Sequence, residues 1–293
     1  MQKFIYYIFI FFVKLISIFS YKTLYKLSNI FSFFLYYFIE YRKEVVLKNL
    51  KNSFPEKDEK EIKEIAKKTY QNLSDIFLET IKNFNAPIEE LKKRFILENP
   101  EFLEDLYKKN KNLIAVLGHY GNWELGAQVA GLYTEYDVYG LYKPIKNIYI
   151  NEYLKKTRGN GSKLVSIYET RKTFLETRKK KSLFLLISDQ SPSSMKKAHW
   201  VDFLNQKTAC LHGAENYARV FDYPVIFIKV SREKRGFYKA KLSMLVNEPK
   251  KAENTGDITK KFMNTLETQI REKPENWLWT HKRWKKNKIL EIY

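Results

Sequence analysis

Three short runs of apolar residues limit the fold of this chain more than any other feature. They are LIAVL (113–117), SLFLLIS (182–188) and PVIFIKV (224–230). A continuous apolar run suits a strand that is buried on both faces, whereas a strand with one wet face alternates between apolar and polar residues. Helical segments separate these runs, and such alternation is typical of a mostly parallel sheet. We therefore predict an α/β fold with a mostly parallel sheet flanked by helices.

Three other segments carry weaker strand signals. DVYGLY (137–142) is one candidate, and FYKAKLSMLV (237–246) alternates in a way that predicts an antiparallel strand at the edge of the sheet. RFILEN (94–99) could be a further strand. Before it, apolar residues at helical spacing predict a long amphipathic helix over residues 57–83.

The amino terminus is strongly apolar. Residues 4–20 (FIYYIFIFFVKLISIFS) and 30–39 (IFSFFLYYFI) contain one charged residue, Lys14. About 17 residues is the lower length for a membrane-spanning helix, and a lysine in its middle makes a clean span costly. A signal peptide would need a small-residue cleavage site, which this run lacks. We predict an N-terminal hydrophobic membrane-anchor helix that enters or lies in the bilayer.

These patterns divide the chain into three parts. Residues 1–40 are predicted to be the membrane anchor, and residues 41–110 a helical preface packed on the catalytic domain. Residues 111–293 are predicted to be the α/β catalytic domain, because the strand signals are concentrated there.

The net charge of +20, from 53 Lys and Arg against 33 Asp and Glu, indicates an anionic partner. Nucleic acid, an anionic membrane and an acidic carrier protein are candidates, and a lysine-rich solvated surface is the plain alternative. The apolar amino terminus favours the membrane. Tryptophans among basic residues in the segment 275–288 suit either an interfacial segment or aromatic core packing, and no DNA- or RNA-binding signature accompanies them. We therefore expect no nucleic-acid partner.

The first apolar run leads into a candidate general base. Functional groups of a parallel sheet gather beyond the carboxyl ends of its strands, and His119 and Glu124 follow the run at a turn and a helix start. Asn122 can cap that helix. A histidine with a carboxylate partner is a general-base arrangement, although a loop histidine and a helix-start acid would look the same. We expect a His119–Glu124 hydrogen bond that faces an apolar tunnel.

The second apolar run ends in Asp189 and Gln190, before a Ser-Pro turn. Asp189 could form the turn, or it could be a site carboxylate that holds a cation. That cation could be Arg158, since Gly159 and Gly161 beside it let the backbone approach a ligand. Without such a context, Arg158 would be one more surface charge.

Several other chemistries lack their motifs. The chain has no GxGxxG after a strand, no GxxxxGK[ST] and no GxSxG. Its four histidines and single cysteine, Cys210, lack metal-ligand spacing, and one cysteine cannot form an intrachain disulfide. We expect no cofactor and no metal, and we interpret His199, His212 and His281 as structural.

The order of several short motifs gives the chain a family resemblance. A His and an acidic residue separated by four residues, His119-Tyr-Gly-Asn-Trp-Glu124, follow the apolar amino terminus. Further blocks come after them: YKP (142–144), Arg158-Gly159, SDQSP (188–192), WVDFLNQKTACLHGAE (200–215) and WLWTHKRWK (277–285). In these blocks the whole chain resembles the late, or secondary, lipid A biosynthesis acyltransferases of Gram-negative bacteria, within the lysophospholipid acyltransferase superfamily.

The resemblance implies a reaction, a site and a location. Such enzymes move a fatty acyl chain from a thioester, usually acyl–acyl carrier protein, to a hydroxyl of a lipid A precursor, at the cytoplasmic face of the inner membrane and without a cofactor. The implied fold is glycerolipid acyltransferase-like. His119 would be the general base and Glu124 its partner, with direct attack of the hydroxyl on the thioester. The residues implied in substrate binding or transition-state stabilisation are Arg158, Asp189, Asn122, Lys143 and Gln190. Many relatives have arginine at position 143, and lysine lacks its bidentate fork.

Two alternatives remain open at this stage. One is a lysophospholipid or glycolipid acyltransferase that uses acyl-CoA, and the other is a non-catalytic, membrane-tethered basic protein that binds lipid. Loss of acyl transfer in His119→Ala and Glu124→Ala would favour an enzyme. A binding protein would keep its lipid affinity in both variants.

Overall fold

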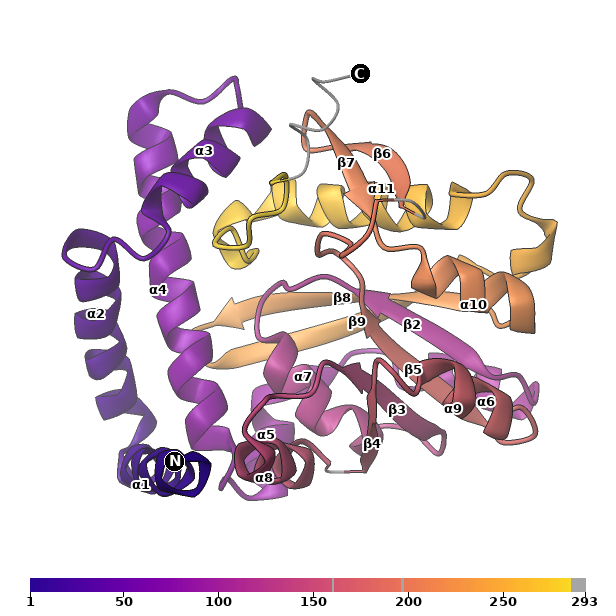
Figure 1. Cartoon of the computed structure of the whole chain (residues 1–293), viewed down its shortest axis with the longest axis horizontal. Helices are drawn as coiled ribbons and strands as arrows, with labels where there is room; N and C mark the ends of the chain where they lie inside the picture. Colours follow the sequence, from indigo (N-terminus) through magenta and orange to yellow (C-terminus); the bar gives the residue numbers. More distant parts are fainter. Residues whose placement is uncertain (160, 196–197, 286–293) are drawn as a thin grey trace.

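The computed structural model of the protein describes residues 1–159, 161–195 and 198–285. Within these residues, seven strands form one sheet in the order β1-β9-β8-β2-β5-β3-β4 (Figure 1). The strands are β1 (Phe95–Leu97), β2 (Leu113–Leu117), β3 (Asp137–Tyr142), β4 (Ser162–Ser166), β5 (Ser182–Ile187), β8 (Val225–Lys234) and β9 (Phe237–Val246). Neighbouring strands are parallel except for β8 and β9, which confirms the predicted mostly parallel sheet.

Strand β2 lies in the middle of the sheet, and all five of its residues are buried, as its apolar sequence predicts. It pairs with β5 on one side and with β8 on the other. Leu117 lies opposite Ile187, so β2 and β5 end at the same edge. The residues that follow these two strands therefore start from adjacent points, although about 70 positions separate them in the sequence.

Helices cover both faces of the sheet, as predicted. On one face the core contains side chains of α5 (Ile88–Arg94), α6 (Glu101–Lys108) and α7 (Trp123–Val129). On the other face it contains side chains of α9 (Thr170–Glu176), α10 (Gly213–Phe221) and α11 (Asp257–Glu272). Figure 1 shows α7 and α11 on opposite sides of β8 and β9. Helix α8 (Ile148–Arg158) and the short 3₁₀ turns η1 (Ala130–Leu132), η2 (Pro249–Lys251) and η3 (Pro274–Asn276) complete this part of the fold.

One edge of the sheet differs from the prediction. Strand β9 has the predicted bounds and the predicted antiparallel pairing with β8. It is not an edge strand, however, because β1 pairs with its outer side at positions 238–240. The burial of β9 still alternates along much of its length, and this produces the pattern that looks like an edge. Strand β4 and the separate hairpin of β6 (His199–Phe203) and β7 (Gln206–Cys210) have mixed sequences and were not predicted.

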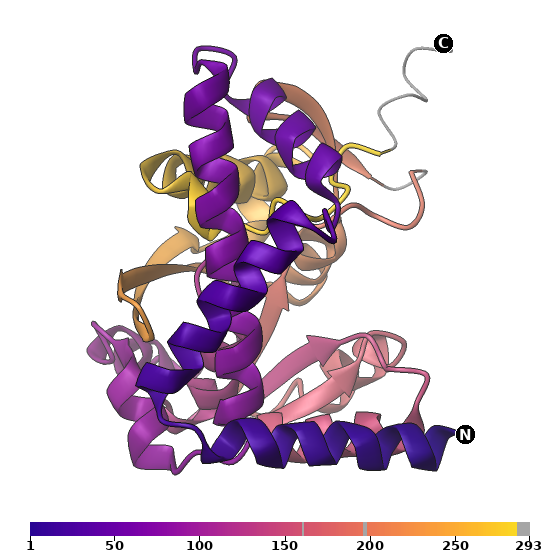
Figure 2. The same ribbon diagram turned by 90° about the vertical axis from the view of Figure 1, so that its left-hand side faces the viewer.

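Four helices come before α5 and the first strand of the sheet: α1 (Gln2–Ile18), α2 (Tyr21–Tyr37), α3 (Lys43–Ser53) and α4 (Glu59–Asn83). Helix α4 is the predicted long amphipathic helix. It begins after Asp58, which forms a capping box with Glu61. Figure 2 shows α2 beside α4, and α1 across the lower end of α4.

The two apolar runs at the amino terminus form two separate helices rather than one anchor. Helix α1 ends at Ile18, and the Ser20 side chain caps α2 by accepting a hydrogen bond from the backbone N–H of Thr23. No helix in residues 1–159, 161–195 or 198–285 is both long enough and apolar enough to cross a membrane. Two helices thus occupy the segment for which a single anchor helix was predicted.

The tryptophan-rich segment near the carboxyl end belongs to the core. Trp277 and Trp279 are buried and pack edge to face, with ring centroids 4.7 Å apart. Of the two interpretations of this segment, the structure supports core packing for these two residues. Residues 286–288 of the segment lie outside the described residues.

Candidate active site

The site begins where β2 and β5 end. His119 follows β2 and Asp189 follows β5, and the adjacent strand ends bring the two side chains together. His119 Nδ1 lies 2.5 Å from Asp189 Oδ1, and the backbone N–H of His119 donates to Asp189 Oδ2 over 2.8 Å. The carboxylate therefore holds both the ring and the backbone of the histidine.

Asp189 is buried and receives a further donor. The indole N–H of Trp277 donates to Asp189 Oδ2 over 2.8 Å. Burial alone would raise the pKa of the Asp189 carboxyl, but His119 and the N–H donors lower it to about 2. Burial alone would lower the pKa of His119, but the carboxylates of Asp189 and Glu124 outweigh it and raise this pKa above its ordinary value.

This arrangement selects one tautomer of neutral His119. Because Nδ1 faces an ionised carboxylate, it carries the proton, and the lone pair lies on Nε2. Gln190 Nε2 lies 3.1 Å from His119 Nε2, so the amide of Gln190 donates to that lone pair. A base with its lone pair on Nε2 can accept a proton from a hydroxyl at the same position.

The expected hydrogen bond between His119 and Glu124 is not formed, since the two ring nitrogens contact Asp189 and Gln190. The turn between the two residues explains the difference. Gly121 has a positive φ of 59°, and α7 begins only at Trp123. The spacing of five residues is therefore not a helical spacing, and Trp123 packs edge to face against the His119 ring at 5.1 Å.

Glu124 instead forms an ion pair with Arg158. The distance from Glu124 Oε2 to Arg158 Nη2 is 2.7 Å, and both side chains are about three-quarters buried. The expectation that Arg158 could be the cation held by Asp189 is therefore wrong, because the carboxylate that holds it belongs to Glu124. The Nε atom of Arg158 is buried and has no hydrogen-bond partner in the described part of the chain, so this guanidinium can still donate.

Asn122 has a supporting position in the site. Its side-chain oxygen caps α7 by accepting from the backbone N–H of Leu125, and its side-chain nitrogen donates to Glu79 over 2.7 Å. Asn122 is completely buried, so both ends of its carboxamide are used inside the protein. Burial raises the pKa of Glu79, which also accepts a hydrogen bond from the hydroxyl of Tyr238.

Lys143 is not brought into this cluster. It is exposed in the loop after β3 and makes no hydrogen bond or ion pair with the described residues. The preceding residue, Tyr142, lines the cavity described next.

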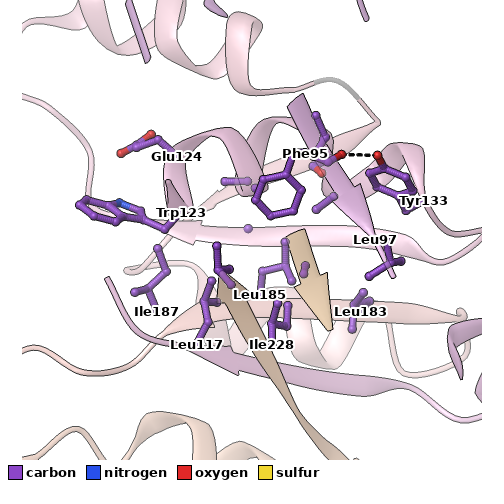
Figure 3. Close-up of a pocket in the computed structure, with 18 of the residues that line it drawn as sticks. Phe95, Leu97, Leu117, Trp123, Glu124, Tyr133, Leu183, Leu185, Ile187 and Ile228 are labelled. Carbon is purple, nitrogen blue, oxygen red and sulfur yellow. Dashed lines mark hydrogen bonds between the residues drawn. The ribbon is translucent and has the colours of Figure 1, made fainter. Parts of the chain in front are cut away.

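An apolar cavity of about 180 Å³ lies under α7. Figure 3 shows Trp123 and Glu124 at one end of it, and Leu97 and Leu183 at the other. Ile187, Leu185 and Leu183 of β5 line it in turn; at about 3.3 Å per strand residue, this wall extends about 13 Å. Glu124 and Arg158 are the charged residues of the lining. An apolar cavity thus lies where an apolar tunnel was expected. The His119–Asp189 pair lies near its polar end, because the His119 ring packs against Trp123.

The contribution of Trp277 was missed from the sequence. The segment around it runs alongside the loop of His119: Leu278 N donates to the His119 carbonyl, and Gly121 N donates to the Asn276 carbonyl. Both sequence-based interpretations of this segment, an interfacial segment and core packing, consider its tryptophans only as apolar aromatic rings. The signal that could have found this role is the indole N–H, which needs an acceptor when it is buried.

The described residues show no group of three or more His, Cys, Asp and Glu side chains that could hold a metal ion. The chemistry that the site supports with its own residues is proton transfer at Nε2 of His119, beside an apolar cavity. Arg158 adds a positive charge at the polar end of this cavity.

Comparison with curated protein sequences gives no match for the chain. The sequence pattern of the bacterial lipid A biosynthesis acyltransferase family matches residues 1–286, which is nearly the whole chain. The chain therefore belongs to the family of bacterial lipid A biosynthesis acyltransferases.

Proposed function

We propose that this acyltransferase moves a fatty acyl chain from a thioester donor to a hydroxyl of a lipid A precursor, with His119 as general base and Asp189 as its partner. The observation that carries the proposal is the His119–Asp189 pair close to the polar end of an apolar cavity. The cavity suits the hydrocarbon chain, and the pair suits the removal of a proton from the acceptor.

The proposed reaction uses each of these groups in its observed position. Nε2 of His119 takes the proton of the acceptor hydroxyl, and its oxygen attacks the thioester carbon. The carbon–sulfur bond then breaks, the thiolate leaves, and the imidazolium returns the proton to it. Asp189 stabilises the imidazolium that forms. General-base assistance contributes about 10²–10⁴-fold to the rate.

Arg158 is the proposed stabiliser of the negative charge that builds on the thioester oxygen. Its guanidinium lines the polar end of the cavity, and Glu124 fixes its orientation. A preorganised donor at such a position is worth more than the same donor in water. In this proposal Glu124 positions Arg158, whereas the sequence predicts it as the partner of His119.

We propose acyl–acyl carrier protein as the donor, with acyl-CoA as the alternative. The net charge of +20 favours an acidic carrier protein. Comparison of kcat/KM for the two donors at low and high salt distinguishes them. A carrier-protein donor should lose the most activity at high salt, because its whole surface contributes to the attraction.

We also propose that the enzyme acts at the cytoplasmic face of the bacterial inner membrane. The segment 1–39 contains no Asp or Glu but has four lysines. Its helices expose a set of large apolar side chains: Phe4, Ile5, Tyr7, Ile8, Phe11, Phe12, Leu15, Ile18, Leu27, Ile30, Phe33, Phe34 and Tyr37. Exposed apolar area of this kind beside basic residues suits an anionic bilayer. The proposal fails if replacement of Phe4, Phe11 and Phe12 by serine leaves flotation with anionic vesicles unchanged.

The function is tested by acyl transfer to a purified lipid A precursor that lacks its secondary acyl chains. His119→Ala should lower the rate by about 10²–10⁴-fold. His199→Ala, in the hairpin strand β6, is the matched control and should keep the wild-type rate within a few-fold. Full transfer activity of purified His119→Ala would refute the mechanism. In cells that lack the chain, mass spectrometry of lipid A should show the loss of one acyl group.

A further inference from the structure

The side chain of Gln190 occupies the position that the acceptor hydroxyl needs. Its amide nitrogen lies 3.1 Å from Nε2 of His119, the atom that accepts the proton in the proposed mechanism. Because Asp189 faces Nδ1, the lone pair on Nε2 is the acceptor of this bond. In this structure the base is therefore covered by a group of the protein itself.

The backbone holds Gln190 in this place from both sides. The Asp189 carboxylate accepts hydrogen bonds from three donors: the ring Nδ1–H of His119, the backbone N–H of His119 and the indole N–H of Trp277. Ser191 donates its backbone N–H to Nε2 of His281 over 3.2 Å, and its hydroxyl donates to the Arg283 carbonyl over 2.5 Å. Burial lowers the pKa of His281 to about 4, so its ring is neutral and can accept this bond at neutral pH.

The Gln190 carboxamide itself is free to leave. Its contact with His119 is its one hydrogen bond to the described residues, and the residue is partly exposed. Because the backbone is held and the side chain is not, the carboxamide can move away from His119 while the loop stays in place. Only the side-chain torsions have to change.

We propose that Gln190 covers the basic nitrogen of His119 until an acceptor hydroxyl displaces it, and that this protects the bound thioester from water. The inference rests on the proposed function and adds a residue that decides between transfer and hydrolysis. In the unwanted reaction, water gives a proton to His119 and its oxygen bonds to the thioester carbon. The carbon–sulfur bond breaks, the proton passes to the departing thiolate, and the products are a free fatty acid and a thiol.

The two competitors differ in the binding energy that they bring. A water molecule has only its own hydrogen bonds with which to displace a tethered amide. The acceptor lipid also binds through its sugar and its acyl chains, and this remote binding energy can be used to displace Gln190. The cover therefore opposes water more than it opposes the acceptor.

The test measures hydrolysis and transfer side by side with a lauroyl thioester of acyl carrier protein and of coenzyme A. Without acceptor, Gln190→Ala should release thiol about three- to tenfold faster than wild type, the range that one net hydrogen bond gives. With saturating lipid A precursor, which displaces Gln190 when it binds, the ratio of the hydrolysis rate to the transfer rate should rise above the wild-type ratio. Gln190→Leu fills the same space without the hydrogen bond and should hydrolyse faster than wild type as well. An unchanged ratio in Gln190→Ala, or wild-type hydrolysis in Gln190→Leu, overturns the proposal.

Controls separate this inference from the proposed function. Gln206→Ala removes an amide of the β6–β7 hairpin that donates to the Ser53 hydroxyl of α3 and to the Leu204 carbonyl. This variant should leave the ratio unchanged. The double variant His119→Ala/Gln190→Ala should return hydrolysis to the background rate, because both reactions need the same base. If His119→Ala keeps transfer, the proposed function fails. If His119→Ala loses transfer while Gln190→Ala keeps the wild-type ratio, only the role of Gln190 fails.

Discussion

At the scale of single residues, the carboxylate of Asp189 controls both the tautomer and the pKa of His119. The pKa of His119 is raised, so the wild-type rate should fall as the pH decreases through a value above 6.5 and the base becomes protonated. Asp189→Asn removes the carboxylate that raises the pKa of His119. Burial is then the largest remaining influence, and it lowers this pKa. We therefore expect the acidic limb of the pH–rate profile to move to lower pH, while the plateau falls by roughly 10²–10⁴-fold.

This prediction is checked by kcat/KM for acyl transfer between about pH 5 and pH 9. Asp137→Asn is the matched control, because Asp137 forms an exposed ion pair with Lys163 away from the site. An acidic limb in Asp189→Asn that stays at the wild-type pH would show that Asp189 does not set the pKa of His119. A shift in Asp137→Asn of the same size would show a general charge effect.

His119 and Asp189 could be predicted as site residues from the sequence, because each lies two positions beyond the last apolar residue of an apolar run. Their pairing could not. It depends on β5 lying next to β2 with Leu117 opposite Ile187, and nothing local in either segment encodes that neighbour. Glu124 was the apparent partner because it is near in sequence, but the turn at Gly121 directs it to Arg158.

At the scale of secondary-structure elements, strand β3 helps to determine the volume of the apolar cavity, because it has a glycine where it lines the cavity. Gly140 lines the cavity and lies opposite Leu185, the middle one of the three β5 residues that form the apolar wall. A Cβ at this position would meet Leu164 at 3.1 Å, so a larger side chain must project into the cavity or displace that neighbour. Gly140→Val should move the acyl-chain preference toward shorter donors. Each methylene that loses its place costs about 0.8 kcal/mol, or roughly fourfold in kcat/KM.

The measurement is a profile of kcat/KM over a series of saturated acyl donors. Lys163→Val, on the neighbouring strand β4, is the control, because this exposed residue does not line the cavity. The assignment of the cavity to the acyl chain would be wrong if Gly140→Val lowered activity equally for every chain length.

A helix or strand could be predicted from the sequence where a single local pattern, such as an apolar run or helical spacing, was clear. The apolar runs predicted β2, β5 and β8, and apolar residues at helical spacing predicted α4. Strand β4 and the hairpin β6–β7 mix polar and apolar residues, so their pairing comes from tertiary contacts. The anchor helix was predicted from hydrophobicity alone, whereas the local hydrogen bond of Ser20 divides the segment into two helices.

At the scale of the whole molecule, the amino-terminal helices are joined to the sheet by a buried charge cluster. Asp75 of α4 is completely buried and forms ion pairs with Arg232 and Arg235 at the end of the β8–β9 hairpin. Its Oδ1 also accepts from the hydroxyl of Ser28 on α2 over 2.5 Å. One carboxylate thus connects α2, α4 and the hairpin, and these are the elements that place the exposed apolar helices against the catalytic part of the chain.

Asp75→Asn should therefore destabilise the fold strongly. The asparagine keeps the shape but leaves two guanidinium groups without their counter-charge, and the loss of one partner of a buried ion pair costs about 3–5 kcal/mol. Both arginines retain some exposure, and their partial rehydration places the expected loss toward the lower end of that range.

The measurement is the free energy of unfolding from urea titration in detergent, followed by tryptophan fluorescence. Asp105→Asn, in an exposed pair with Lys108, should change it by less than about 1 kcal/mol. A loss below about 1 kcal/mol in Asp75→Asn would mean that apolar packing of α2 and α4, rather than this charge cluster, joins the amino-terminal helices to the sheet.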